Sequence, residues 1–264
     1  MSEYSMDSRE SKLPNTPPPT VLPDGSTKGK SIVLEDSTQK KINPVKYYVK
    51  FSFALTYILL LTTATITIIE ALRTKSPYVR HILNLETAIS IVAGYFYSVF
   101  VSQIENFSDK GIEIDWADIT KTRYIDWSIT TPMMLLALCL VLSHNAGKSV
   151  TLGVIALLVL LNYAMLYIGY LGESNSINRY MGTILGFIPF VMMFSIIYYQ
   201  YVRPGKSFSN NVLFTLYTGI WSLYGVVYMF NEEYKNIAMN ILDCCAKCLI
   251  GLGLWAYYAK IITL

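Results

Sequence analysis

The last hydrophobic segment of this 264-residue chain carries an amine where charge is costly. Residues 236–264 are long and apolar enough to cross a bilayer, which takes about 20 residues, and Lys247 lies near their middle. An ionisable side chain at that depth is rare and usually functional. Asp243 lies one helical turn earlier on the same face. A lysine beside a carboxylate in a dry site suits a Schiff base, whose protonated nitrogen needs a counter-ion; the alternative is a structural ion pair that joins two helices.

A second set of residues that could do chemistry lies in the segment RYIDWSITTPMMLL at 123–136. Arg123, Asp126 and Thr130 are spaced i, i+3 and i+7, which places them on one stripe of a helix. A second carboxylate inside a hydrophobic segment, with an arginine one turn away, indicates a buried charge cluster and not a lipid-facing surface.

Three motifs together resemble the microbial (type 1) rhodopsins, whose lysine binds all-trans-retinal. They are RYxDWxxTTPxxLL at 123–136, WxxY at 221–224 and LDxxAK at 242–247, and their order and spacing match that family over roughly residues 46–264. The resemblance implies a retinal-binding fold with all-trans-retinal as the cofactor. Lys247 would be the Schiff-base lysine, and Asp126 and Asp243 the paired counter-ion. Arg123 and Thr130 would be the partners of that counter-ion.

The same resemblance implies an apolar slot of aromatic and small residues around the chromophore. Trp127 and Trp221 match the positions that sandwich the polyene, and Met134 matches the family's colour-tuning position; ordinary bundle packing is the alternative. The predicted pocket comprises Tyr124, Trp127, Thr131, Met134, Gly186, Trp221, Tyr224 and Tyr228. The chain departs from the family pattern at Gly225, where proline is common, and at Tyr228, where tryptophan is common.

The composition predicts that these residues are held by membrane-spanning helices. Hydrophobic residues make up 53% of the chain and the mean hydropathy is +0.40, which is too apolar for a soluble domain of this size. Seven spans are predicted, at about 47–72, 79–104, 120–143, 149–171, 177–201, 208–231 and 236–262. Because the connections are short, sequential helices should pack as antiparallel neighbours in one all-α bundle.

The first 45 residues differ in kind from the rest. They contain the proline-rich run LPNTPPPT, many serines and lysines, and no apolar segment long enough for a secretory signal. Such a composition cannot bury enough surface to offset chain entropy, so residues 1–45 are predicted to be a disordered tail before a rhodopsin domain at 46–264.

Loop charge predicts the orientation of the bundle in the membrane. One set of loops is basic, and it carries Arg73, Lys75, Arg80, Lys148, Arg203 and Lys206. The opposite set is acidic, and it carries Glu105, Asp109, Glu113, Asp115, Asp118, Glu232 and Glu233. The basic side should be cytoplasmic, with the N-terminus outside and the C-terminus inside, in the plasma membrane of a host cell. The net charge of +3 is then explained by the basic residues that set the orientation in the membrane, and no nucleic-acid partner is expected.

The cysteines and histidines predict no metal centre. Cys139, Cys244, Cys245 and Cys248 all fall inside predicted helices, and two of them flank Lys247 within a turn. A metal or redox site is the alternative, but buried cysteine is more often a small hydrophobe, and no histidine lies near. His81 and His144 are placed at helix ends as solvated residues.

The choice between ion channel and ion pump depends on Ala137 and Glu86. Ala137 lies three turns, or about 16 Å, beyond Asp126, where outward proton pumps of the family usually hold a carboxylic acid. Alanine cannot carry a proton, which weakens the pump interpretation. Glu86 on the second helix is the candidate replacement and would line an ion path with Asn84 and Asn240, or with Asn162. The alternative is that Glu86 extends to the membrane interface.

The sequence therefore favours a light-gated cation channel, with an outward proton pump as the alternative. The NLET and AGYFY runs of the second helix are similar to viral rhodopsins of large algal viruses, one group of which are light-gated cation channels. A photosensor that signals through a partner is less favoured, because no output domain follows the seventh helix. A seven-helix receptor without retinal leaves Lys247, Asp126 and Asp243 unexplained.

We expect no enzyme activity. The expected partners are the lipid bilayer and monovalent cations or protons, and a homo-oligomer is compatible with this interpretation.

Overall fold

The computed structural model describes residues 44–204 and 207–262. The predicted tail therefore lies outside the described residues, apart from Pro44 and Val45, which already belong to the first helix. Lys206 of the predicted basic loops also lies outside them.

Seven helices make up nearly all of the described chain, as the sequence predicts. They are α2 (Pro44–Arg73), α3 (Pro77–Asp109), α4 (Trp116–Asn145), α5 (Leu152–Glu173), α6 (Arg179–Ile197) continued by the π-helical η1 (Tyr198–Val202), α7 (Phe208–Val227), and α8 (Glu232–Asp243) continued by the π-helical η2 (Cys244–Leu249) and by α9 (Ile250–Tyr258). Lys247 lies inside η2, and single π-helical turns within α-helices often occur at functional sites.

Side-chain caps fix where several of these helices begin. The Asp115 carboxylate accepts hydrogen bonds from the backbone N–H groups of Ala117 and Asp118 at the start of α4. The side chains of Asn178 and Asn231 do the same at the starts of α6 and α8. These caps satisfy backbone N–H groups that have no partner within the helix, and so they favour helix initiation at these residues.

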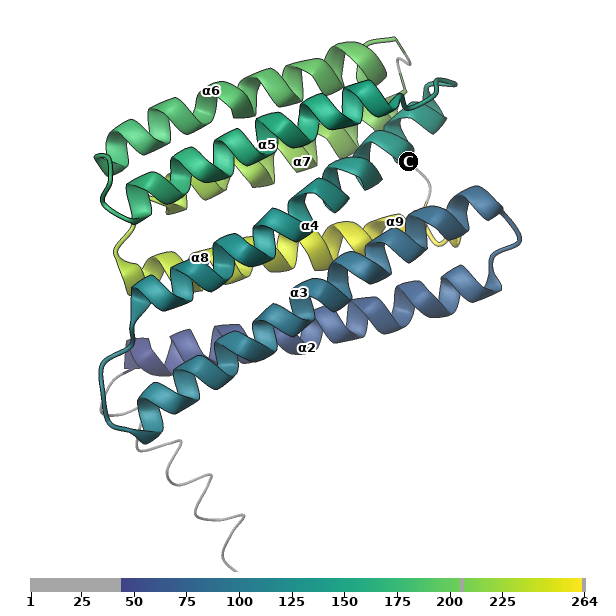
Figure 1. The fold of residues 1–264 in the computed structure, drawn as a ribbon. Helices are drawn as coiled ribbons and strands as arrows, with labels where there is room; N and C mark the ends of the chain where they lie inside the picture. Colours follow the sequence, from purple (N-terminus) through teal and green to yellow (C-terminus); the bar gives the residue numbers. More distant parts are fainter. Residues whose placement is uncertain (1–43, 205–206, 263–264) are drawn as a thin grey trace, which may run out of the picture. The chain divides into compact units, whose positions relative to one another are not determined.

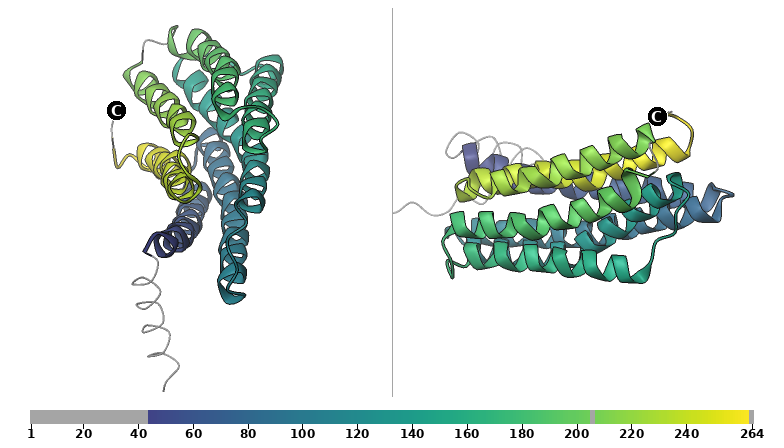
Figure 2. Two further views of the ribbon diagram at one scale, coloured as in Figure 1. Left: turned by 90° about the vertical axis from the view of Figure 1, so that its left-hand side faces the viewer. Right: turned by 90° about the horizontal axis from the view of Figure 1, so that it is seen from above.

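Sequential helices pack against each other, and the bundle is closed by the last one. The helices run side by side in all the views (Figures 1 and 2), and α8 packs against α2 although the two are far apart in sequence. The connections 110–115, 174–178 and 228–231 lie at one end, called here the α3–α4 end. The connections 74–76 and 146–151 lie at the other, the α2–α3 end, as do the described residues 203, 204 and 207.

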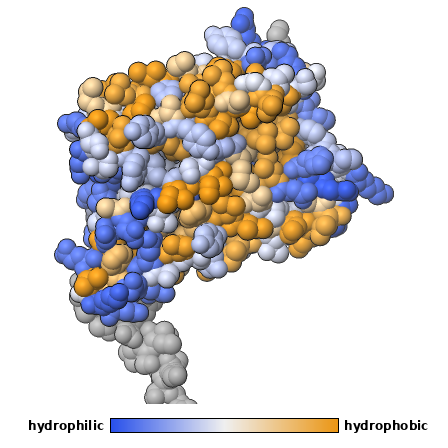
Figure 3. Space-filling view, viewed as in Figure 1, coloured by the Kyte–Doolittle hydropathy of each residue, from blue (hydrophilic) through white to orange (hydrophobic). Residues whose placement is uncertain are grey.

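The surface of the bundle suits a bilayer. Six of the helical spans are long and apolar enough to cross a membrane. The helix α7 is not among these six. It has 20 residues and no charged side chain, but its serines, asparagines and threonines lower its hydropathy. Hydrophobic side chains cover the middle of the bundle, and hydrophilic ones gather toward its two ends (Figure 3). Large apolar residues such as Leu160 and Ile184 are exposed there, as lipid contact requires.

Candidate functional site

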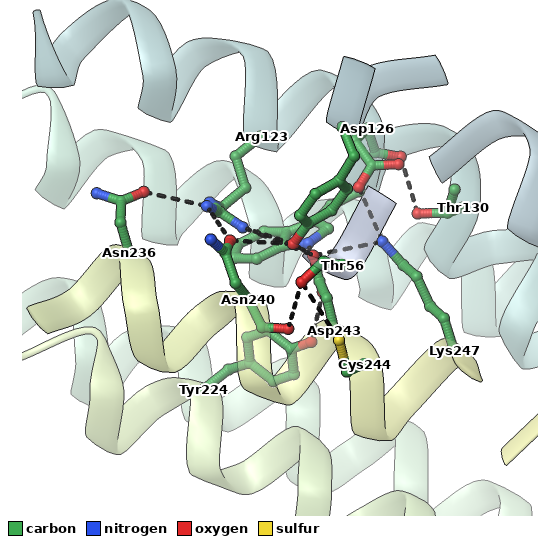
Figure 4. Close-up of polar contacts among 12 residues, drawn as sticks. Thr56, Arg123, Asp126, Thr130, Tyr224, Asn236, Asn240, Asp243, Cys244 and Lys247 are labelled. Carbon is green, nitrogen blue, oxygen red and sulfur yellow. Dashed lines mark hydrogen bonds and ion pairs between the residues drawn. The ribbon is translucent and has the colours of Figure 1, made fainter. Parts of the chain in front are cut away.

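Lys247 and Asp126 form the central contact of the buried site. The Lys247 Nζ donates a hydrogen bond to Asp126 Oδ2 at 2.8 Å, and its distance to Asp243 Oδ2 is 3.6 Å (Figure 4). All three side chains are at most 2% exposed. Asp126 comes from α4 and the other two from the last helix, so the site exists only because these helices pack together.

Asp243 is held by three further donors. Its Oδ2 accepts a hydrogen bond from Tyr97 Oη at 2.6 Å, and its Oδ1 accepts from Tyr224 Oη at 2.5 Å and from Trp127 Nε1 at 3.4 Å. Hydrogen bonds to a carboxylate favour its charged form and fix its position. Asp243 is therefore a fixed anion whose charge several donors share.

Arg123 completes a buried cluster with two positive and two negative groups. Its Nη1 lies 3.5 Å from Asp243 Oδ2, and its Nη2 donates to Asn236 Oδ1 at 3.0 Å and to Asn240 Oδ1 at 2.8 Å. Arg123 therefore contacts Asp243 through one nitrogen, because the two amide side chains of α8 occupy the other. The Arg123 guanidinium contacts both Asp243 and Asn236 and so joins the two (Figure 4).

Asp126 keeps one oxygen free of the surrounding side chains. Its Oδ1 is buried and has no hydrogen-bond partner among the described residues. The Thr130 hydroxyl, predicted as a partner, donates to the backbone carbonyl of Asp126 at 2.9 Å and not to its carboxylate. Threonine in a helix commonly bonds to the carbonyl one turn back, and this local bond is the one the structure shows.

An apolar cavity opens next to Lys247, and all eight residues predicted for the pocket line it. Its wall also includes Met165, Leu166, Gly169, Gly182, Thr183, Phe187, Phe190, Gly225, Met239, Asp243, Ala246 and Lys247. The rings of Trp127 and Tyr224 meet edge to face at 5.4 Å, and those of Phe194 and Trp221 at 5.7 Å. An apolar cavity with one amine in its wall, and a carboxylate hydrogen-bonded to that amine, fits a polyene aldehyde.

Glycines shape the end of the cavity formed by α5, α6 and α7. A Cβ at Gly225 would lie 2.5 Å from Phe187 Cε2, so the ring of Phe187 fits only because residue 225 has no side chain. A Cβ at Gly172 would overlap the hydroxyl of Tyr228, which donates to the carbonyl of Gly169 at 2.9 Å. The two departures from the family pattern, Gly225 and Tyr228, thus lie in one tightly packed wall.

The four residues considered for the ion path fall in four different places. Glu86 is 2% exposed and faces the bundle, so its extension to the membrane interface is not what the structure shows. Asn84 is exposed on another face of α3, because two residues along a helix turn a side chain by about 200°. Asn240 lies in the Arg123 cluster, on the other side of Lys247 from Glu86. Asn162 donates to Thr131 Oγ1 at 2.8 Å.

Sequence reasoning missed Tyr97 and Asn236. Tyr97 is fully buried, and its hydroxyl bonds to Asp243 and accepts from Arg123 Nη1 at 3.3 Å. The AGYFY run contains Tyr97, but only the buried face of α3 identifies which of its two tyrosines points inward. The predicted packing cysteines include Cys244, whose Sγ lies 3.2 Å from Thr56 Oγ1.

The comparisons with known proteins agree with this geometry. Residues 48–261 match the family of bacteriorhodopsin-like proteins. The chain is similar to the viral rhodopsin OLPVRII, with 43% identity, a TM-score of 0.75, and coverage of 81% of this chain and 99% of that one.

Similarity to the proteorhodopsins is lower. The blue light-absorbing proteorhodopsin from Med12 shares 23% identity, with a TM-score of 0.64 and coverage of 81% of this chain and 98% of that one, which shows the fold alone. The green-light absorbing proteorhodopsin of Gamma-proteobacterium EBAC31A08 is 27% identical over 170 residues, 57% of this chain and 66%, just under two thirds, of its own length. The predicted likeness to viral rhodopsins is confirmed. The chain belongs to the bacteriorhodopsin-like family of microbial rhodopsins, which are multi-pass integral membrane proteins with a retinal chromophore.

Proposed function

We propose that this protein is a light-gated cation channel whose chromophore is all-trans-retinal bound to Lys247. Members of its family are photoreceptors, pumps or channels and not classical enzymes. Retinal joined to Lys247 as a Schiff base supplies light absorption and isomerisation. The residues that would hold it are those of the cavity wall, above all Trp127, Trp221 and Tyr224.

The protein's own side chains hold the proton on Lys247 Nζ. Asp126 Oδ2, at 2.8 Å, is the nearest acceptor, and its other oxygen is free to take part in proton transfer. Asp243 is already bonded to Tyr97 and Tyr224, which makes it the less suitable acceptor. Asp126 therefore takes the proton from Nζ after light absorption, and Asp243 with Arg123 keeps the local charge balanced.

One observation favours a channel: buried polar side chains continue along the bundle on both sides of Lys247. We call this set the polar seam. It comprises Thr56, Thr63 and Thr67 of α2, Glu86, Thr87, Ser90 and Tyr97 of α3, and Asn236, Asn240 and Asp243 of α8. Asn240 Nδ2 donates to Ser52 Oγ at 2.9 Å near one end, and Thr67 bonds to Thr87 at 2.8 Å near the other.

Glu86 is the acid of the polar seam that lies between Lys247 and the α2–α3 end. Glu86 Oε2 would lie 3.2 Å from a Cβ at Gly251, which places it one turn beyond Lys247 along the last helix. Glu86 Oε1 and Ser90 Oγ have no hydrogen-bond partner among the described residues and are free to contact a cation. Carboxylate and hydroxyl oxygens are the groups that replace the hydration of a cation in a membrane.

The described residues around Ala137 of α4 are apolar. Ala137 is fully buried in an apolar cluster with residues such as Leu138, Phe194 and Ile250, so α4 offers no proton donor there. An outward proton pump is the second candidate, and one observation favours it: Glu86 is an isolated buried acid that could return a proton to Lys247.

Orientation and location follow from charge. We propose that the α3–α4 end, with Asp109, Glu113 and Asp115, is extracellular and that the α2–α3 end is cytoplasmic, in the plasma membrane of a host cell. The transported species would be monovalent cations, and the chain would consist of a tail before α2 and a channel domain that begins with α2.

Glu86→Gln separates the alternatives, because it keeps the shape of the side chain and removes its charge. For a channel, cation photocurrent or selectivity changes while the dark absorption band stays in place. For a pump, return of the proton to Lys247 Nζ becomes slower and added azide restores it. If both the photocurrent and the photocycle are unchanged, Glu86 is not part of the ion path and the channel proposal loses its main support.

A further inference from the structure

Four charged side chains form a ring of ion pairs at the α3–α4 end of the bundle. Lys235 Nζ donates to Glu173 Oε2 at 2.7 Å and to Glu232 Oε1 at 2.9 Å. Arg179 Nη2 contacts the same two acids at 3.1 and 3.0 Å. Each acid is thus shared by two bases, and the ring as a whole is neutral.

The ring reaches from the interior of the bundle to its surface. The side chains of Lys235 and Glu173 are 2% and 4% exposed, whereas those of Arg179 and Glu232 are 30% and 31% exposed. Glu173 is the last residue of α5, Arg179 the first of α6, and Glu232 the first of α8. The Arg179 guanidinium also lies 5.7 Å from the ring centre of Tyr228 at the end of α7. The ring therefore ties four helix ends together.

The ring is also the outer neighbour of the charge cluster around Lys247. Arg123 Nη2 donates to Asn236 Oδ1, and Asn236 Nδ2 donates to the carbonyl oxygen of Glu232 at 2.8 Å. Asn236 directly follows Lys235 in the chain. Asn236 thus joins Arg123 to Glu232, a member of the ring.

We propose that this ring closes the ion route at the α3–α4 end and that Lys235 is the residue that restricts cation passage. The inference rests on the proposed channel function. The Lys235 amine neutralises Glu173 and occupies the carboxylate oxygens that would otherwise attract a cation, and this pairing in a low dielectric holds the route closed. Cation flow requires that Lys235 and Glu173 separate.

Lys235→Gln tests this assignment by voltage clamp under illumination, with sodium as the only permeant metal ion. Without the amine, Glu173 keeps only Arg179 as a partner, and this end of the route becomes more negative. We expect the sodium photocurrent to rise by roughly tenfold, the low end of the effect of fixed charge on local counter-ion concentration in a cleft. The absorption band should stay in place, because Lys235 does not line the cavity.

Lys50→Gln is the matched control. Lys50 forms an ion pair with Glu105 at 3.5 Å at the same end of the bundle, but both side chains are largely exposed, so this pair places no buried charge there. Its photocurrent should equal that of the unmodified protein. If Lys235→Gln does not form a pigment, Glu173→Gln with Lys235→Gln removes the buried ion pair that must separate before cations flow, and the current should again rise.

A Lys235 variant that forms the pigment and gives an unchanged sodium photocurrent overturns the assignment. In that case a normal photocurrent from the unmodified protein would leave the proposed channel function standing. If the unmodified protein gave no sodium photocurrent, both proposals would fall.

Discussion

Lys247 Nζ lies 2.8 Å from Asp126 Oδ2 and 3.6 Å from Asp243 Oδ2, so two carboxylates that are equivalent in the sequence motifs are unequal in the structure. Asp126 bonds directly to the amine. Asp243 shares its charge among Tyr97, Tyr224 and Arg123. Because of this difference, we expect a substitution at Asp126 to change the absorption band more than the same substitution at Asp243.

Asp126→Asn should shift the absorption band further to the red than Asp243→Asn. The charge of Asp126 stabilises the positive charge on Nζ at the shorter distance, and its loss narrows the gap between ground and excited states. Acidifying the unmodified protein until Asp126 is protonated should give the same shift. Absorption spectra of the two variants and an acid titration check this, and a larger shift in Asp243→Asn would assign the main counter-ion to Asp243.

Lys247→Ala should abolish the visible band after reconstitution with all-trans-retinal, because the cavity wall contains no other amine. The matched control is Lys260→Ala, which removes an exposed lysine near the end of the same helix and should leave the band intact. A visible band of normal strength in Lys247→Ala would rule out the proposed attachment.

Gly251→Ala should alter the cation photocurrent much as Glu86→Gln does. Its added Cβ would lie 3.2 Å from Glu86 Oε2 and 3.2 Å from Thr63 Cγ2, so the carboxylate must move. Gly253→Ala is the control, since no atom lies within 4 Å of a Cβ there. Adding Thr63→Ser removes the crowding methyl group and should restore part of the current. Equal currents in the Gly251 and Gly253 variants would contradict a positioning role for Gly251.

Gly225→Ala should shift the absorption band, because its Cβ would displace the Phe187 ring that forms part of the cavity wall. Gly219→Ala on the same helix has nothing within 4 Å of its Cβ and should leave the band unchanged. Overpacking of this kind costs about 1–3 kcal/mol, so the thermal stability of the pigment should fall with the shift. A Gly225 variant with an unchanged spectrum and stability would show that Phe187 can move without reshaping the cavity.

The helices and the cavity wall were accessible to sequence reasoning because they depend on short-range patterns. Hydropathy places the seven helices, and the i, i+3, i+7 spacing of Arg123, Asp126 and Thr130 places them on the interior face of α4. The family motifs add the aromatic residues from α7, such as Trp221 and Tyr224, which line the same cavity.

Contacts between helices distant in sequence were not accessible in the same way. The bond between Tyr97 and Asp243 joins residues 146 positions apart, and no local pattern marks it. Glu232 was interpreted only as a loop charge that sets orientation, although with Glu173, Arg179 and Lys235 it forms a ring of ion pairs. Asn84 and Glu86 are neighbours in sequence, but helix geometry sends them to different faces.

The reversal potential of the photocurrent tests the central claim most directly. The unmodified protein is illuminated under voltage clamp at constant pH on both sides, while the external sodium concentration is changed tenfold. A light-gated cation channel predicts a current that changes sign with voltage. For a purely sodium-selective route, the voltage at which it changes sign shifts by about 59 mV when the external sodium concentration is changed tenfold. A photocurrent that stays outward at every voltage and does not respond to sodium would contradict the channel and establish an outward proton pump.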